Sequence, residues 1–92
     1  MRHELVPRRQ FLRDIKRLKE AGWPMQALTE FLDCLRRGHP FPEKYQVHEL
    51  HGELEGVWDG HVRQNWVVLF RYRKKGIIEL SRTGTHASLG IS

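Results

Sequence analysis

The sequence predicts an α+β fold, in which a helical hairpin packs on one face of a small antiparallel sheet. Two observations predict it: apolar residues recur at helical spacing in the first half of the chain, and short apolar runs separated by turn residues fill the second half. A helical hairpin needs a surface for its apolar stripes, and the sheet supplies one. The chain has 92 residues, enough for one domain and not two, so we expect residues 1–92 to form a single domain.

Two antiparallel helices are predicted in the first half of the chain. The first covers residues 8–21 and ends before Gly22, which can take the left-handed conformation that follows many helices. The second begins near Pro24, a residue suited to the first helical position, and ends at Gly38. Because the link between them is short, the helices should form a hairpin. Their apolar stripes consist of Phe11, Ile15 and Leu18 in the first helix and of Met25, Leu28, Leu32 and Leu35 in the second.

Four strands are predicted. The first is a short strand at residues 2–6, ended by Pro7, which has no N–H to donate to a neighbouring strand. The other three form a meander near the C-terminus, at residues 57–62, 66–72 and 77–80. The middle strand of the meander is the most apolar run in the chain and should lie at the centre of the sheet.

The remaining stretches are expected to be loops. Residues 39–45 hold two prolines two positions apart, which is incompatible with a helix or a central strand. Residues 48–56 contain glycines and two histidines and should form a second loop. The turns of the meander are predicted at residues 63–65 and 73–76.

The charge balance indicates an anionic partner. The net charge is +5 and the isoelectric point about 9.9, with six Lys or Arg residues in each of the segments 8–20 and 63–82. Such clustering favours a polyanion or an acidic protein. No apolar run reaches the ~20 residues that a membrane helix needs, and the N-terminus lacks the apolar core of a signal peptide. With a single cysteine, Cys34, we expect a cytoplasmic protein without a membrane partner.

The run 81–86 places groups that suit a phosphate within a few residues. Arg82 offers a planar fork of donors that matches phosphate oxygens, and His86 can exchange a proton near neutral pH. Gly84, between the hydroxyls of Thr83 and Thr85, can turn backbone N–H groups toward an anion. The alternative is a polar loop that merely closes the sheet.

Six histidines leave three interpretations open. The spacing of His48 and His51 allows a metal site completed by His61 or His86, although no cysteine lies nearby and the loop is not helical. The second interpretation is acid–base cleavage of RNA, which needs a base for the 2′-hydroxyl, a cation for the phosphorane and an acid for the leaving 5′-oxygen. The third is that the histidines are scattered surface residues.

An ordered set of residues in the second half of the chain resembles a known family. The segment 40–89 is similar to the YafQ branch of the RelE/ParE superfamily of bacterial type II toxins, whose members are small α+β domains. The preceding helical hairpin agrees in type. The matching residues are Pro40, Pro42, Tyr45, His48, Leu50, Gly52, His61, Val62, Trp66, Arg82, Thr83, Gly84, Thr85, His86, Ala87 and Leu89.

The resemblance implies a function and a set of roles. Members cut messenger RNA in the ribosomal A site, beside ribosomal RNA, without a metal or other cofactor, and a cognate antitoxin holds them inactive. Operator DNA would be bound only indirectly, through the antitoxin. By this resemblance His86 is the general acid and Arg82 contacts the scissile phosphate, while His48 and His61 orient the substrate or share the role of base. The residues expected to bind RNA are Arg63, Asn65, Trp66, Lys74, Lys75, Thr83 and Thr85. Trp66 would stack on RNA, although a tryptophan that opens an apolar strand more commonly packs in the core.

Three features do not fit this resemblance. Asn65 stands where the family has an aspartate, and an amide cannot act as a general base. Gly90 stands where the family has an aromatic residue and offers no stacking surface. Strict alternation along the last strand would also place Arg82 on the same face as Ile78 and Leu80, in conflict with an exposed site.

Two other functions are compatible with the composition. One is a non-nuclease inhibitor on the same fold, like the gyrase-directed ParE branch, which would need no histidine cluster. The other is a basic nucleic-acid-binding module, whose affinity would depend on salt and on Lys and Arg content, with histidine substitutions nearly silent.

Overall fold

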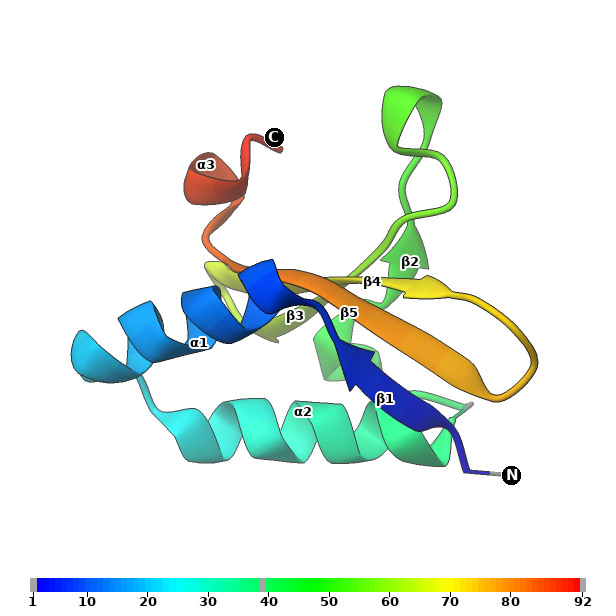
Figure 1. The fold of residues 1–92 in the computed structure, drawn as a ribbon, viewed down its shortest axis with the longest axis horizontal. Coiled ribbons are helices and arrows are strands. Elements are labelled where there is room, and N and C mark those ends of the chain that lie inside the picture. The colour runs from blue at the N-terminus through cyan, green and yellow to red at the C-terminus, as the bar shows by residue number, and fades with distance from the viewer. Residues whose placement is uncertain (1, 39, 92) are drawn as a thin grey trace.

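The computed structural model describes residues 2–38 and 40–91 and shows a helical hairpin beside a sheet (Figure 1). Within the described residues the sheet has five strands in the order β1-β5-β4-β3-β2. The predicted α+β class, with a short N-terminal strand, two helices and then the meander, is confirmed. The elements are β1 (Glu4–Pro7), α1 (Arg9–Glu20), α2 (Met25–Arg37), β2 (His48–Glu49), β3 (Trp58–Arg63), β4 (Trp66–Tyr72), β5 (Ile77–Gly84) and α3 (His86–Leu89), with 3-10 turns at Glu43–Tyr45 and Gly52–Leu54.

The sheet differs from the prediction in three respects. It is mixed, because β1 pairs in parallel with β5 and the other pairings are antiparallel. The loop predicted at residues 48–56 contributes the two-residue strand β2 at the edge beside β3. β5 runs on past residue 80 to Gly84, and α3 follows it. Parallel pairing needs a long crossover between the strands, and its partner is fixed by tertiary packing, not by local pattern. The predicted connector 39–45 begins at His39, which lies outside the described residues.

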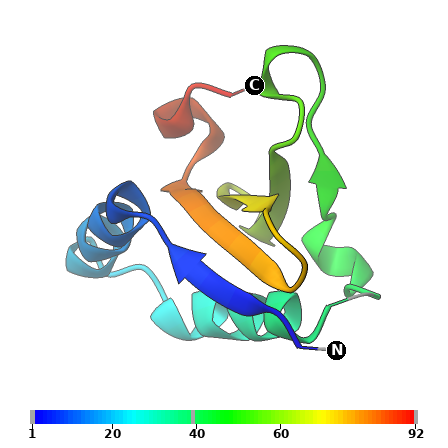
Figure 2. The ribbon, with the colours of Figure 1, turned by 45° about the vertical axis from the view of Figure 1, so that its right-hand side comes forward.

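The core lies between the helical hairpin and one face of the sheet, which we call the covered face. The side chains of Trp66, Val68 and Phe70 alternate along β4 and join the core cluster with Phe31 and other helix residues. Gly60 on β3 permits this packing, because a Cβ atom there would lie 2.5 Å from the Phe31 ring. Figure 2 shows α1 and α2 beside the sheet, and α3 at the end of the sheet where β5 finishes.

The opposite face, which we call the open face, carries the intervening residues of the same strands. In the β3–β4 pair, Asp59 is opposite Leu69 and His61 is opposite Val67. Leu69 and Val67 are buried, but the histidine at this face is partly exposed. Polar and apolar residues therefore lie together here.

A bulge in β5 decides the direction of Arg82. Phe70 pairs with Leu80, whereas the preceding residue Leu69 pairs with Arg82, so Ser81 is an extra residue in the ladder. An extra residue reverses the alternation of side chains beyond it. Arg82 therefore shares the open face with Leu69, which resolves the conflict predicted from strict alternation.

Candidate active site

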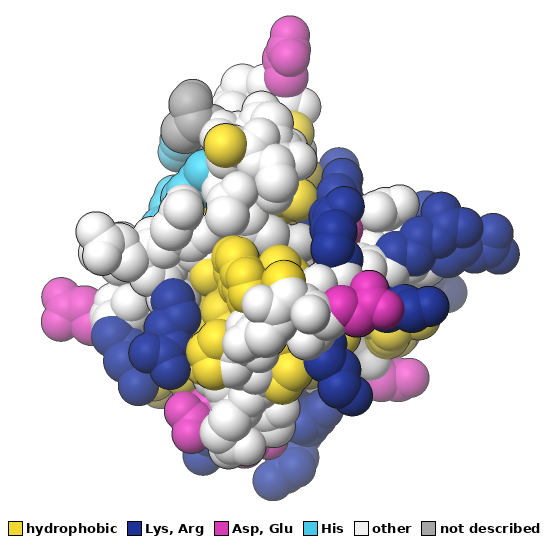
Figure 3. All heavy atoms as spheres, turned by 90° about the vertical axis from the view of Figure 1, so that its left-hand side faces the viewer, with side chains coloured by type: hydrophobic (Ala, Val, Ile, Leu, Met, Phe, Trp, Pro, Cys, Tyr) yellow, Lys and Arg dark blue, Asp and Glu magenta, His cyan; other side chains and the backbone are white. Residues whose placement is uncertain are grey.

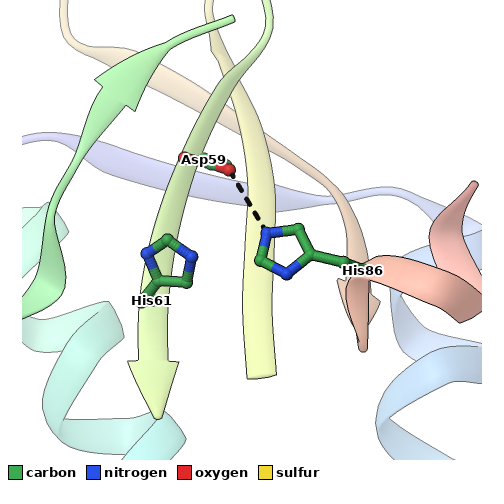
Figure 4. Close-up of side chains that lie close together, drawn as sticks. All are labelled: Asp59, His61 and His86. Atoms are coloured by element: carbon green, nitrogen blue, oxygen red, sulfur yellow. Dashed lines mark ion pairs between the residues drawn. The ribbon is translucent and has the colours of Figure 1, made fainter. Parts of the chain in front are cut away.

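A buried carboxylate lies at the centre of the open face. Asp59 on β3 is 2% exposed, with its side chain among the histidines (Figure 4). Its Oδ1 lies 3.0 Å from Nδ1 of His48, and its Oδ2 lies 3.9 Å from Nε2 of His86. Oδ1 accepts no well-aligned hydrogen bond within the described part of the chain. A buried acceptor without a well-aligned hydrogen bond is costly, so this carboxylate is suited to orient the imidazole N–H groups beside it.

Three histidines from three different elements surround this carboxylate. The ring centroids of His61 and His86 lie 5.2 Å apart, and those of His48 and His61 lie 6.5 Å apart. His48 is on β2, His61 on β3 and His86 at the start of α3, so no local spacing relates all three. The structure brings together the three histidines singled out in the sequence.

The geometry of His48 fixes its tautomer. Its Nδ1 lies 2.8 Å from the carbonyl oxygen of Gln46 and near the Asp59 carboxylate, and both of these groups are acceptors. Nδ1 must therefore carry the hydrogen, which leaves the Nε2 lone pair of a neutral ring free. Gln46 supplies its carbonyl from a left-handed conformation, with φ of 46°. His48 is thus arranged to accept a proton at Nε2.

His86 is held by the short helix that it begins. Thr85 caps this helix: its hydroxyl accepts a hydrogen bond from the Ser88 N–H at 3.0 Å, and the Ser88 hydroxyl accepts one from the Thr85 N–H at 3.0 Å. At the other end, Gly90 has φ of 72°, a left-handed value that favours glycine. The glycine that replaces the family's aromatic residue thus ends the helix that positions His86.

Arg82 reaches a second buried carboxylate, Asp14 on α1. The Arg82 Nε donates a hydrogen bond to Asp14 Oδ2 at 2.8 Å, and the Arg82 side chain remains 34% exposed. Burial opposes ionisation of Asp14, but hydrogen bonds from Arg82 and the Thr83 N–H outweigh it and lower the pKa of the carboxyl. The same hydrogen bond raises the pKa of Arg82.

Two predicted RNA-binding residues are buried in the core instead. Trp66 is 2% exposed and packs edge to face on Trp23, with ring centroids 5.0 Å apart. Its Nε1 donates to the hydroxyl of the fully buried Thr83 at 2.8 Å, and that hydroxyl donates to the Val67 carbonyl at 2.9 Å. Because both side chains face the covered side and have satisfied polar groups, neither is placed to contact RNA in this structure.

Other predicted residues lie at different distances from the histidines. Lys74 and Lys75 are exposed in the β4–β5 turn, at the far end of the eight-residue β5 from His86, about 25 Å away along the strand. Arg63 is the last residue of β3 and Asn65 lies in the following turn, and both are exposed near His61. His51 is exposed in the loop after β2. The structure therefore places the two lysines outside the histidine cluster.

Two basic hollows flank the cluster. A groove of about 440 Å³ on the open face is lined by Arg8, Arg71, Arg73 and Arg82 around Leu69, with Glu79 paired to Arg8 and Arg73 in the same lining. A second hollow of about 440 Å³ includes His61 and the side chains of Lys44 and Arg63. In Figure 3, which faces the α1–α2 turn, histidines lie together at one edge and Lys and Arg flank an apolar centre. These surfaces suit an anionic strand that passes the histidines on either side.

The same groups offer ligands for a metal ion. Among the residues that the structure describes, one ligand atom each from Asp59, His61 and His86 lie within 4.8 Å of one another. The metal site considered in the sequence, based on His48 and His51, is not this set. Carboxylate and imidazole ligands are those of zinc sites, although a zinc ion would also compete for the nitrogens needed for proton transfer.

Asp59 and Asp14 were not among the site residues predicted from the sequence. A signal for Asp59 was present, because Asp59 and His61 are two residues apart on a predicted strand and so share a face. Asp14 lies three residues after Phe11 and four before Leu18, so a charged residue on the apolar stripe was visible, but its partner Arg82, 68 residues away, was not. In the described segments, no helix has the length and apolar character needed to cross a membrane.

The fold and the site define a class of protein. A helical hairpin on one face of a small sheet, with clustered histidines and an arginine on the other, is the arrangement implied by the resemblance to RelE-like bacterial toxins. Within this class the chain belongs to the YafQ family: the family model described as "Bacterial toxin of type II toxin-antitoxin system, YafQ" matches residues 3–90.

Three similar proteins support the assignment. The chain is 31% identical over 81 residues to the mRNA interferase toxin YafQ of Escherichia coli K12, with 87% of each sequence covered. The crystal structure of YafQ from E. coli BL21(DE3) has a TM-score of 0.87 and 27% identity, covering 95% of this chain and 97% of that one. YafQ in the E. coli DinJ–YafQ toxin–antitoxin complex has a TM-score of 0.86 and 28% identity, covering 97% and 98%. The resemblance predicted from the sequence is confirmed.

Proposed function

We propose that this toxin is a ribosome-dependent mRNA interferase, which cuts messenger RNA in the ribosomal A site by acid–base chemistry and without a metal. The observation that carries the proposal is the cluster of His48, His61 and His86 around the buried Asp59. The E. coli relative is named an mRNA interferase. The whole chain, residues 1–92, is assigned as one toxin domain.

Each step of the cleavage has a group of suitable geometry. Nε2 of His48 takes the proton of the ribose 2′-hydroxyl, because Nδ1 is occupied by the Gln46 carbonyl. The 2′-oxygen attacks phosphorus, the bond to the 5′-oxygen breaks, and a 2′,3′-cyclic phosphate forms. His86, whose Nε2 lies 3.9 Å from Oδ2 of Asp59, gives a proton to the 5′-oxygen in its protonated form. Arg82 stabilises the negative charge that develops on the phosphorane.

Asn65 is not needed for this scheme. It stands in the exposed turn after β3, and His48 supplies the base that an amide cannot. His61 lies between the other two rings and positions the RNA. Arg63 and Thr85, at the margins of the cluster, are expected to contact RNA. Lys74 and Lys75 lie farther away and would add weaker RNA contacts.

The cell context follows from charge and from the related complex. A chain of net charge +5 suits an acidic antitoxin, and the E. coli relative has been crystallised with the antitoxin DinJ. The antitoxin would hold the toxin inactive in the cytoplasm and would carry any contact with operator DNA. The ribosome, through mRNA and rRNA contacts, would position the 2′-hydroxyl for attack, which three histidines alone do not do. Such positioning can lower the activation barrier by ~7–11 kcal/mol.

The alternatives make different demands on the histidines. A ParE-like inhibitor or a purely basic binding module has no use for three imidazoles around a buried carboxylate. Metal-dependent cleavage would use Asp59, His61 and His86 as ligands. Full activity in EDTA supports the proposed chemistry, and loss of activity that zinc restores would establish the metal-dependent one instead.

The deciding experiment is single-turnover cleavage of one message on programmed ribosomes by His86→Gln. We expect a loss of about 10²-fold or more, because the acid is removed. The matched control is His51→Gln, which removes an exposed histidine outside the cluster and should cleave like the parent. Parental activity in His86→Gln would remove the proposed function.

A further inference from the structure

A fully buried carboxylate on α1 grips the arginine of the proposed active site. Asp14 is 0% exposed and accepts two hydrogen bonds from one guanidinium, at 2.8 Å from Nε and 3.3 Å from Nη2 of Arg82. It also accepts the Thr83 N–H at 3.0 Å. Gln10 and Arg17 on its own helix donate at 3.3 and 3.1 Å.

These contacts keep Asp14 charged in the interior. A buried carboxylate is costly unless several donors surround it, and here donors come from both α1 and β5. The bulge at Ser81 turns both the Arg82 side chain and the Thr83 N–H toward this one carboxylate. A charged group held by so many partners is well suited to fix the position of another side chain.

The contact leaves a defined edge of Arg82 free. Asp14 occupies the Nε–Nη2 edge of the planar guanidinium, and no hydrogen-bond partner of Nη1 is found in the described part of the chain. A guanidinium has five N–H donors in a rigid fork, so the Nη1 side keeps donors for a second anion. That side belongs to a side chain that is 34% exposed and lines the basic groove.

We propose that Asp14 is a positioning residue for RNA cleavage: it holds Arg82 so that the free edge of the guanidinium meets the scissile phosphate beside His86. The inference rests on the proposed function. It assigns Asp14 a role distinct from merely joining α1 to the sheet, because a structural joint would change stability and leave the chemical step intact. A displacement of about 1 Å in such a group can cost ~10²-fold in rate.

The test is a double-mutant cycle in single-turnover cleavage on programmed ribosomes. Asp14→Asn should lower the rate at saturating ribosomes about 10²-fold with little change in the concentration for half-maximal rate. Arg82→Ala should be equally slow, and the double variant no slower than Arg82→Ala. The matched control is Arg17→Ala, which removes another donor to Asp14 without touching Arg82 and should keep the parental saturating rate.

A readout independent of activity separates this inference from the proposed function. The Nε–H signal of Arg82 in a ¹⁵N NMR spectrum should be sharp and protected from exchange in the parent and averaged in Asp14→Asn. If Asp14→Asn does not fold, Asp14→Glu replaces it in the experiment. This variant keeps the charge but displaces the guanidinium, so its cleavage rate should lie between those of the parent and Arg82→Ala.

Two outcomes would overturn the inference. One is parental cleavage by a folded Asp14→Asn protein, and the other is a double variant whose losses multiply. A mobile Arg82 signal in the parent would likewise contradict it. If Arg82→Ala itself cleaves at the parental rate while the NMR signal shows a held Arg82, the proposed role of Arg82 in cleavage fails, and the contact with Asp14 stands as structure only.

Discussion

The two faces of the sheet are built from the same strands, yet they differ in composition and in role. On β3 and β4 the covered face carries Gly60, Val68 and Phe70 against the helices, while the open face carries Asp59 and His61 beside buried Val67 and Leu69. Residues next to each other in sequence therefore contribute alternately to the core and to the candidate active site. Burial of a residue on these strands therefore does not reveal its role until the face of the sheet that it occupies is known.

The largest expected effect is on the covered face. Phe31→Ala removes a ring that is 0% exposed and that packs against Gly60, so it should lower the free energy of unfolding by about 3–5 kcal/mol. For a small domain this is much of the total stability. Urea unfolding followed by far-UV circular dichroism measures it. A loss below about 1 kcal/mol would show that the hairpin does not pack on this face as described.

On the open face the effect should appear in the reaction. Asp59→Asn removes the charge that His48 and His86 share, and should lower single-turnover cleavage about 10²-fold, or about 3 kcal/mol of barrier. Stability should change by no more than about 1 kcal/mol, because a buried charge is replaced by a neutral group of the same shape. Glu55→Gln, an exposed change nearby, is the control. Equal cleavage by both variants would refute the role of Asp59.

The Trp66–Thr83 pair tests the boundary between the two faces. Trp66→Phe and Thr83→Val each remove their shared hydrogen bond, and a double-mutant cycle of urea unfolding should show a coupling of about 1 kcal/mol. Cleavage by the folded variants should match the parent in both rate and half-saturating ribosome concentration. A weaker affinity for programmed ribosomes without loss of stability would mean that these residues contact RNA after all.

The smallest expected effect concerns stability as a function of pH, because the contribution of Asp14 changes only in acid. The pKa of Asp14 is lowered in the folded protein, so its contribution is complete above the unfolded value of about 3.9 and is lost as pH falls through the folded pKa. Urea midpoints measured from pH 6 down to 3 should therefore fall, and should fall less steeply in Asp14→Asn. If the urea midpoints of the two proteins fall in parallel as the pH is lowered, Asp14 does not contribute to the loss of stability in acid.

Periodic and local features of this protein were determined by the sequence by itself. His48 and His61 were singled out by the resemblance to the YafQ family, whereas the apolar stripes of both helices, the central strand 66–72 and the run with Arg82 and His86 follow from residue types and their spacing. Such features depend on a few neighbouring residues, so one sequence is enough to find them.

Only the tertiary structure decided which distant residues meet. The parallel pairing of β1 with β5, the bulge at Ser81 and the contact of Asp14 with Arg82 each depend on segments far apart in the chain. A one-residue bulge reverses every later side chain on a strand, and no local propensity marks where it falls. Burial likewise moved Trp66 from a predicted RNA contact into the core, because the face of a strand is set by its partners.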